Sequence, residues 1–244
     1  MSDLVFDDPC VLFALRRESA PFLREFRPHE RVAGAPCWAR FCGPAWLTVL
    51  AAETAGATDA TLPWLLGAPV LEKVPYRPKL VLSAGFAAAL RDDLRPGDVI
   101  LATDVVDAAG QRWPTTWPGD LPPGEWRPPL HRGRVLCQPL PRAERSDALA
   151  QDWSSAAIAQ QCSQRSVPFG CVRVVLAGAQ EPITPSVASL LAGWPASPLH
   201  TLGAALRSPR GFVSLHRRTM HAAGQLGAAL GELLTLTLPG GREL

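Results

Sequence analysis

The strongest indication of the fold comes from residues 80–106, which read LVLSAGFAAALRDDLRPGDVILATDVV. Leu80–Ala84 is a short apolar run of the kind that forms a buried strand, and we expect the strand to end at Gly85. After a Pro-Gly turn, Asp98–Val106 returns as a second strand. The segment therefore predicts two strands of a buried sheet.

Short apolar strands and helical stretches alternate on both sides of this segment. Further strands are expected at residues 11–15, 35–42, 134–137 and 169–176, and helices at 16–26, 45–55, 154–164 and 211–236. The last of these is amphipathic, which is typical of a helix that packs on a sheet. Such alternation favours an α/β fold. A chain of 244 residues of this kind is expected to form a single domain, residues 1–244.

Composition limits the classes of function. With 47% hydrophobic residues the chain can bury a large core, which excludes general disorder. Its 24 basic and 22 acidic side chains are too balanced for a protein that binds nucleic acid by neutralising phosphates. The six cysteines are scattered, and no signal peptide or membrane span is evident. We therefore expect buried free thiols and a cytoplasmic protein.

Residues 108–134 differ from the rest of the chain. They contain six prolines and three tryptophans, a composition that excludes a regular helix or a central strand. Two interpretations remain open. The segment is either a binding loop or lid, or a surface excursion that its aromatic side chains anchor to the body of the protein.

Few motifs for catalysis are visible in the residues themselves. The five histidines are dispersed without metal-ligand spacing, so no metal is expected, and G-x-S-x-G, Walker and G-x-G-x-x-G motifs are missing. Gly43 and Gly85 each follow a predicted strand, where backbone amides can bind an anion or a hydroxyl-rich ligand. The alternative is that Ala84–Ala89 is a tightly packed connection without any ligand.

Four segments taken together resemble a known family. They are ALRRE at 14–18, GPA at 43–45, residues 80–106 above, and QDWSSAAIAQQCSQRSVPFGCVRVVLAGAQEPITP at 151–185. Their motifs are similar to those of the purine nucleoside and uridine phosphorylase superfamily, particularly its methylthioadenosine/S-adenosylhomocysteine nucleosidase-like members. Residues 208–234 are most similar to the hopanoid-associated phosphorylase-like branch.

The resemblance implies a three-layer α/β/α fold around a central mixed sheet, and a homodimer. It also implies a nucleoside-like ligand, adenosylhopane in the hopanoid-associated branch, whose N-glycosidic bond is cleaved by water or phosphate. No cofactor is implied, and phosphate enters only as a candidate co-substrate. Such a reaction needs a group to protonate the base, a group to hold the ribose hydroxyls, and a group to orient the nucleophile.

Some residues match the family pattern. Glu18 stands at the position of the family's water-activating glutamate, and Arg173 at that of its strand arginine. Asp152 and Trp153 match the first two residues of the D-M-E-S motif. Gly43 and Gly85 lie in the two glycine loops.

Other residues depart from the pattern. Ser154 replaces the ribose-binding glutamate, whose carboxylate can accept hydrogen bonds from both vicinal hydroxyls at once, whereas serine offers a single, shorter hydroxyl. Ala177 replaces the aspartate that serves as the general acid. Phe86 replaces the serine or threonine that helps to bind phosphate or water, and a phenyl ring is expected to crowd that position.

These losses leave the enzymatic status open between two hypotheses. In one, the protein is a divergent nucleosidase or phosphorylase in which Glu18 orients water, Arg173 supports the site and the Trp-rich loop contacts the aglycone. In the other, it is a pseudoenzyme that binds a ligand or serves in an assembly. An open cleft with Glu18 exposed favours the first, whereas filling of the cleft by Phe86 and Trp153 favours the second or the ligand-free connection.

Overall fold

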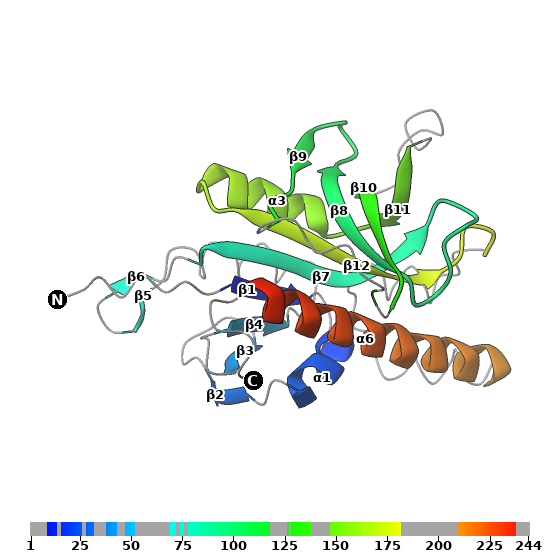
Figure 1. The fold of residues 1–244 in the computed structure, drawn as a ribbon, viewed down its shortest axis with the longest axis horizontal. Helices are drawn as coiled ribbons and strands as arrows, with labels where there is room; N and C mark the ends of the chain where they lie inside the picture. The colour runs from blue at the N-terminus through cyan, green and yellow to red at the C-terminus, as the bar shows by residue number, and fades with distance from the viewer. Residues whose placement is uncertain are drawn as a thin grey trace.

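The computed structural model describes residues 9–13, 16–25, 28–31, 38–42, 47–51, 69–71, 74–75, 78–117, 126, 128–137, 147–181 and 209–237. The elements, labelled as in Figure 1, are β1 (Pro9–Phe13), α1 (Arg16–Glu25), β2 (Pro28–Arg31), β3 (Trp38–Cys42), β4 (Leu47–Ala51), β5 (Pro69–Leu71), β6 (Val74–Pro75), β7 (Leu80–Ala89), β8 (Val99–Val106), β9 (Arg112–Pro114), β10 (Leu130–Cys137), β11 (Ala148–Asp152), α3 (Ser155–Gln164), β12 (Phe169–Ala177) and α6 (Pro209–Thr237).

A mixed sheet forms the centre of the molecule. Its strand order is β11-β10-β8-β12-β7-β1-β4-β3-β2, with β9 paired to β8. β7 runs parallel to both β1 and β12, whereas β8 is antiparallel to β12. β5 and β6 pair separately with each other. The predicted mixed sheet is confirmed.

Five of the strands close into a ring. β11 lies parallel to β10 and also pairs with the end of β7 through Ala150–Ala89 and Gln151–Ala88, which joins β7, β12, β8, β10 and β11. On the same edge of β7, the pairing with β1 ends at Ala84. A short gap therefore remains along β7 between the end of β1 and the beginning of the β11 pairing.

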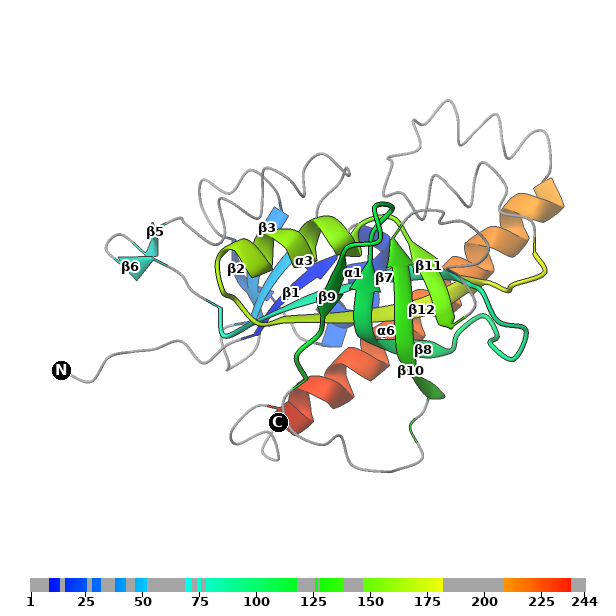
Figure 2. The ribbon, with the colours of Figure 1, turned by 90° about the horizontal axis from the view of Figure 1, so that it is seen from above.

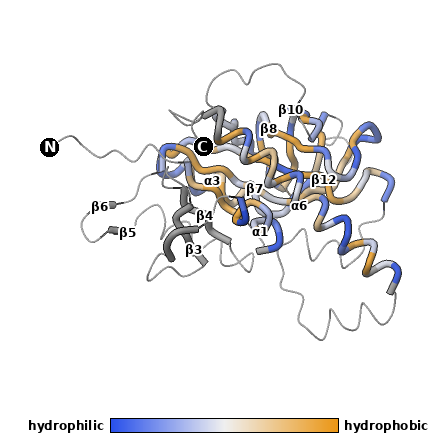
Figure 3. Tube along the Cα trace, turned by 60° about the horizontal axis from the view of Figure 1, so that its bottom comes forward, coloured by the Kyte–Doolittle hydropathy of each residue, from blue (hydrophilic) through white to orange (hydrophobic). Residues whose placement is uncertain are grey.

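Helices cover the sheet on two sides, α3 on one and α1 with α6 on the other (Figures 1 and 2). Ile158 of α3 belongs to one core cluster, and Phe22 of α1 and Leu226 of α6 belong to the other. Neighbouring strand residues alternate between the two clusters, as the two-residue period of a strand requires. Figure 3 shows the apolar run along β8 beside the mixed hydropathy of α6. The three-layer arrangement is confirmed.

Most predicted elements are present. The strands expected near residues 11–15, 35–42, 80–84, 98–106, 134–137 and 169–176 are β1, β3, β7, β8, β10 and β12, and the helices expected at 16–26, 154–164 and 211–236 are α1, α3 and α6. No helix among the described residues combines the length and apolar composition needed to cross a membrane.

Three predictions about elements are wrong. Residues 108–134 are predicted to contain no central strand, but β10 begins at Leu130 and lies between β8 and β11 in the sheet. The helix expected at residues 45–55 is instead strand β4, in which Leu47–Ala51 pairs with β1 and β3. Two-sided pairing in the sheet overrides the helix propensity of the alanine-rich flanks. Gly85 does not end its strand, because β7 continues to Ala89 along β12.

Candidate functional site

Glu18 fills the gap along β7. It lies in the first turn of α1, is 2% exposed, and its Oε1 accepts a hydrogen bond of 2.9 Å from the backbone amide of Phe86. Neither β1 nor β11 reaches this position, so the carboxylate supplies the acceptor that a neighbouring strand otherwise provides. Gly85 permits the approach, because a Cβ there would lie 3.0 Å from Oε1.

A buried ion pair lies on the same part of the sheet. Nε of Arg173 donates to Oδ2 of Asp152 at 2.5 Å, and both side chains are 1% exposed. Nη1 donates to the carbonyls of Ser83 and Val172, and Nη2 to the Ser83 hydroxyl, at 2.7–2.8 Å. The Ser155 hydroxyl donates to the other oxygen of Asp152 at 2.8 Å. Four hydrogen bonds thus hold a charge that burial alone makes unfavourable.

Electrostatics keep Arg173 cationic. Burial acts to lower the pKa of its guanidinium, whereas Cys171, Asp152 and Glu18 act to raise it, and the pKa lies above its ordinary value. The charge of Glu18 therefore contributes to the raised pKa of the same arginine that binds Asp152. Asp152 and Arg173, predicted from the segment 151–185, form one buried ion pair, and Glu18, predicted from the segment 14–18, acts on Arg173 electrostatically.

The thiols near this cluster are poor nucleophiles. Burial raises the pKa of Cys171 to about 12, and burial together with the charge of Asp152 raises the pKa of Cys137. Both remain protonated at neutral pH, so neither presents a thiolate. Cys10, Cys137, Cys162 and Cys171 are free and buried, as predicted for the cysteines.

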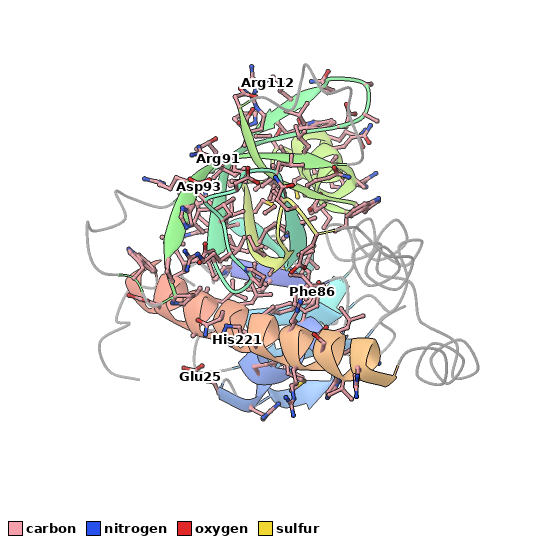
Figure 4. The ribbon with its side chains drawn as sticks, turned by 90° about the vertical axis from the view of Figure 1, so that its right-hand side faces the viewer. Glu25, Phe86, Arg91, Asp93, Arg112 and His221 are labelled. Carbon is pink, nitrogen blue, oxygen red and sulfur yellow. The ribbon has the colours of Figure 1, made fainter. Side chains whose placement is uncertain are left out.

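The residues that replace family side chains lie mostly in the core. Phe86 and Ala177 are each 2% exposed and share a core cluster with α1 and α6, against which the half-buried Trp153 packs. Figure 4 places Phe86 close to α6. The Phe86 ring points into this core layer, while its amide faces Glu18. Ser154 is the half-buried N-cap of α3 and makes no capping hydrogen bond through its side chain.

No family model matches the sequence, and no curated protein matches it. Solved structures do match. A 5'-methylthioadenosine/S-adenosylhomocysteine nucleosidase from Helicobacter pylori is 16% identical, with a TM-score of 0.64 over 94% of this chain and 98% of that one. The chain has the nucleosidase fold. The 5'-methylthioadenosine nucleosidase of Arabidopsis thaliana has a TM-score of 0.68 at 13% identity, covering 98% and 99% of the two chains.

The nucleosidase fold confirms the resemblance that the sequence motifs indicated. A futalosine hydrolase of Helicobacter pylori also shares it, with a TM-score of 0.61 and 15% identity over 93% of this chain and 98% of that one. At these identities the likeness establishes the fold, so the chemistry has to be argued from the residues of this chain.

Because the resemblance aligns Ala177 with the family's general acid, two other carboxylates are candidates for that role. Asp152 is bound by Arg173 and Ser155. Glu181 forms an exposed ion pair with Arg218 of α6 at 2.5 Å. Both are therefore already engaged in the folded chain. Gly43, the other predicted binding residue, lies outside the described residues.

The described part of the Trp-rich segment is anchored to the sheet. Trp117 donates a hydrogen bond of 2.9 Å from Nε1 to the carbonyl of Ala102. Its ring lies against Gly170 at the start of β12, three residues before Arg173. Trp113 and Trp126 each pack against a core cluster. The surface-excursion interpretation accounts for these three side chains.

Sequence reasoning did not find Ser83 and Ser155, which complete the ion-pair cluster. Both stand beside residues that the motifs did select, Gly85 two positions after Ser83 and Ser154 immediately before Ser155. Both could have been found from their position in stretches predicted to be buried, because a buried hydroxyl needs a hydrogen-bond partner. In the part of the chain that the structure describes, no group of three or more His, Cys, Asp or Glu side chains could hold a metal ion.

Proposed function

We propose that this protein binds a purine-nucleoside-like ligand beside β7 and has lost the acid-assisted N-glycosidic cleavage of its ancestral fold. The proposal is supported by the resemblance, which aligns the core residue Ala177 with the family's general acid, and by the place of the Glu18 carboxylate in the gap along β7. Structures with the same fold support the ligand class, since the Helicobacter pylori nucleosidase binds butyl-thio-DADMe-Immucillin-A and a protein from Borrelia burgdorferi binds adenine.

The absence of a proton donor at position 177 is expected to lower the rate of cleavage more than the affinity for the ligand. As the glycosidic bond breaks, negative charge develops on the base, and a positioned general acid contributes about 10²–10⁴-fold in rate by protonating it. The methyl group of Ala177 has no proton to donate, and Asp152 is held by Arg173. Stacking and shape contacts to the base and sugar do not depend on that proton.

A second candidate is slow, water-dependent cleavage through Glu18. The observation in its favour is that the Glu18 carboxylate is held at a fixed place by the Phe86 amide and lies near the buried Arg173. Against it, Glu18 is only 2% exposed, so the exposed carboxylate that would favour an enzyme is not observed. A carboxylate fixed in this way is suited to orienting a water molecule.

One experiment separates the two candidates. Release of free base is measured with methylthioadenosine, adenosylhomocysteine, inosine, futalosine and adenosylhopane, with and without phosphate, and binding is measured as the rise in melting temperature. The matched variants are Glu18→Gln and Glu25→Gln, because Glu25 is an exposed glutamate on the same helix (Figure 4).

We expect a nucleoside to raise the melting temperature of the wild type, while base release stays at least about 10²-fold below that of a nucleosidase that keeps its general acid. Base release above the rate without protein, however slow, that Glu18→Gln abolishes and Glu25→Gln preserves would establish the second candidate instead. If no nucleoside raises the melting temperature and no base is released, both candidates fail.

A further inference from the structure

The contact between α6 and α1 has a close approach at one residue. A Cβ added to Gly227 of α6 would lie 3.1 Å from the backbone nitrogen of Phe22 and 3.3 Å from Cβ of Pro21, both in α1. Backbone atoms cannot move aside by changing rotamer, so a methyl group at 227 requires this part of α1 to give by a few tenths of an ångström. Gly224, one turn earlier on the same helix, would meet nothing within 4 Å.

Helix α1 also packs closely against the sheet, through the side chains of Glu18 and Phe22. Glu18 is four residues before Phe22, so the two side chains leave neighbouring turns of one helix face. Phe22 is fully buried, with its ring 5.6 Å from that of Phe13 on β1. The Glu18 carboxylate touches β7 through the Phe86 amide and the bare α-carbon of Gly85. Helix α1 is thus confined between α6 and β7.

We propose that Gly227 is a positioning residue for Glu18: its close contact with the backbone of α1 sets the distance of the Glu18 carboxylate from the Phe86 amide. Gly227 touches no ligand in this proposal. It acts through α1, and Gly85 acts on the same carboxylate from the sheet side. The consequence for ligand binding rests on the proposed function, whereas the consequence for the Phe86 amide does not.

The direct test is hydrogen exchange at the Phe86 amide. Gly227→Ala is expected to lower the protection of this amide at least about tenfold relative to the core amide of Leu101, because α1 shifts and the hydrogen bond to Glu18 lengthens. Gly224→Ala is the matched control. It is expected to leave the ratio of protection at the Phe86 amide to protection at the Leu101 amide unchanged within about twofold. Gly85→Ala, which presses on the carboxylate from β7, is expected to lower the ratio as Gly227→Ala does.

Several outcomes overturn the proposal. One is unchanged Phe86 protection in Gly227→Ala, and another is an equal loss at Phe86 and Leu101, since this indicates general destabilisation. The proposal is also contradicted if Gly227→Ala fails to fold while Gly85→Ala folds. Gly227 is then needed for the fold as a whole and not for the position of Glu18. If neither variant folds, unchanged Phe86 protection in Glu18→Ala overturns it, since the amide then does not depend on the carboxylate.

A binding cycle tests the consequence for the ligand. Nucleoside affinity is measured for wild type, Gly227→Ala, Glu18→Ala and the double variant. We expect Gly227→Ala to weaken binding in the wild type and to have no further effect when Glu18 is already removed. Additive losses would show that Gly227 does not act through Glu18. If the wild type binds no nucleoside, the proposed function fails, while the exchange experiment still decides the role of Gly227.

Discussion

Single residues explain how a polar cluster persists inside the sheet. Arg173 takes its partners from three strands, Ser83 of β7, Val172 of its own strand β12 and Asp152 of β11. Motif spacing identified Arg173 and Asp152 as site residues, but it could not show that they bind each other. That pairing depends on the closure of β11 onto β7, which brings together residues 21 positions apart.

Removing one member of this pair is expected to be costly. Asp152→Asn leaves the Arg173 charge buried without its carboxylate and should lower the free energy of unfolding by about 3–5 kcal/mol. The control is Asp147→Asn, because the Asp147 side chain is exposed in its ion pair with the half-buried Arg134 and should contribute less than about 1 kcal/mol. Urea denaturation measures both, and equal losses would contradict the prediction.

At the scale of elements, the sequence predicted those with strong internal patterns. β7, β8 and β12 are nearly continuous apolar runs, and α6 is amphipathic over 29 residues. β11 was missed because ALAQD has no apolar alternation and is recognisable only through its partners. β4 was predicted as a helix for the same reason, since its pairing with β1 and β3 is not visible in its own residues.

The anchoring of the Trp-rich segment gives a prediction at this scale. Trp117→Phe keeps the aromatic contact with Gly170 but removes the hydrogen bond to the Ala102 carbonyl. We expect a loss of about 1 kcal/mol in stability and no change in nucleoside affinity. A large change in affinity without a change in stability would show that this segment contacts the ligand.

The whole molecule has the nucleosidase fold, and Ala177, which the resemblance aligns with the family's general acid, is buried in its core. The motifs identified the fold because they spread over most of the chain. They could not settle the site, because the orientation of Phe86, with its ring in the core and its amide on Glu18, depends on where β1 ends.

Global stability should depend on pH through the buried thiols. Burial raises the pKa of Cys162 and of Cys171 to about 12 from an ordinary value of 9.0. Between these two values the folded state holds protons that the unfolded state has released, so stability falls as the pH rises. Urea denaturation from pH 8 to pH 11 should show this fall, and Cys162→Ala together with Cys171→Ala should flatten it. An equally steep fall in the double variant would contradict the assignment.

The ion pair of Arg173 and Asp152 has a consequence for the history of such chains. Because these two side chains tie three strands of the ring together, losing either one leaves a buried charge unpaired, whether or not the chain turns over a substrate. Finding this arginine and aspartate in a distant homologue is therefore evidence of a sound scaffold, and an active enzyme has to be inferred from other positions.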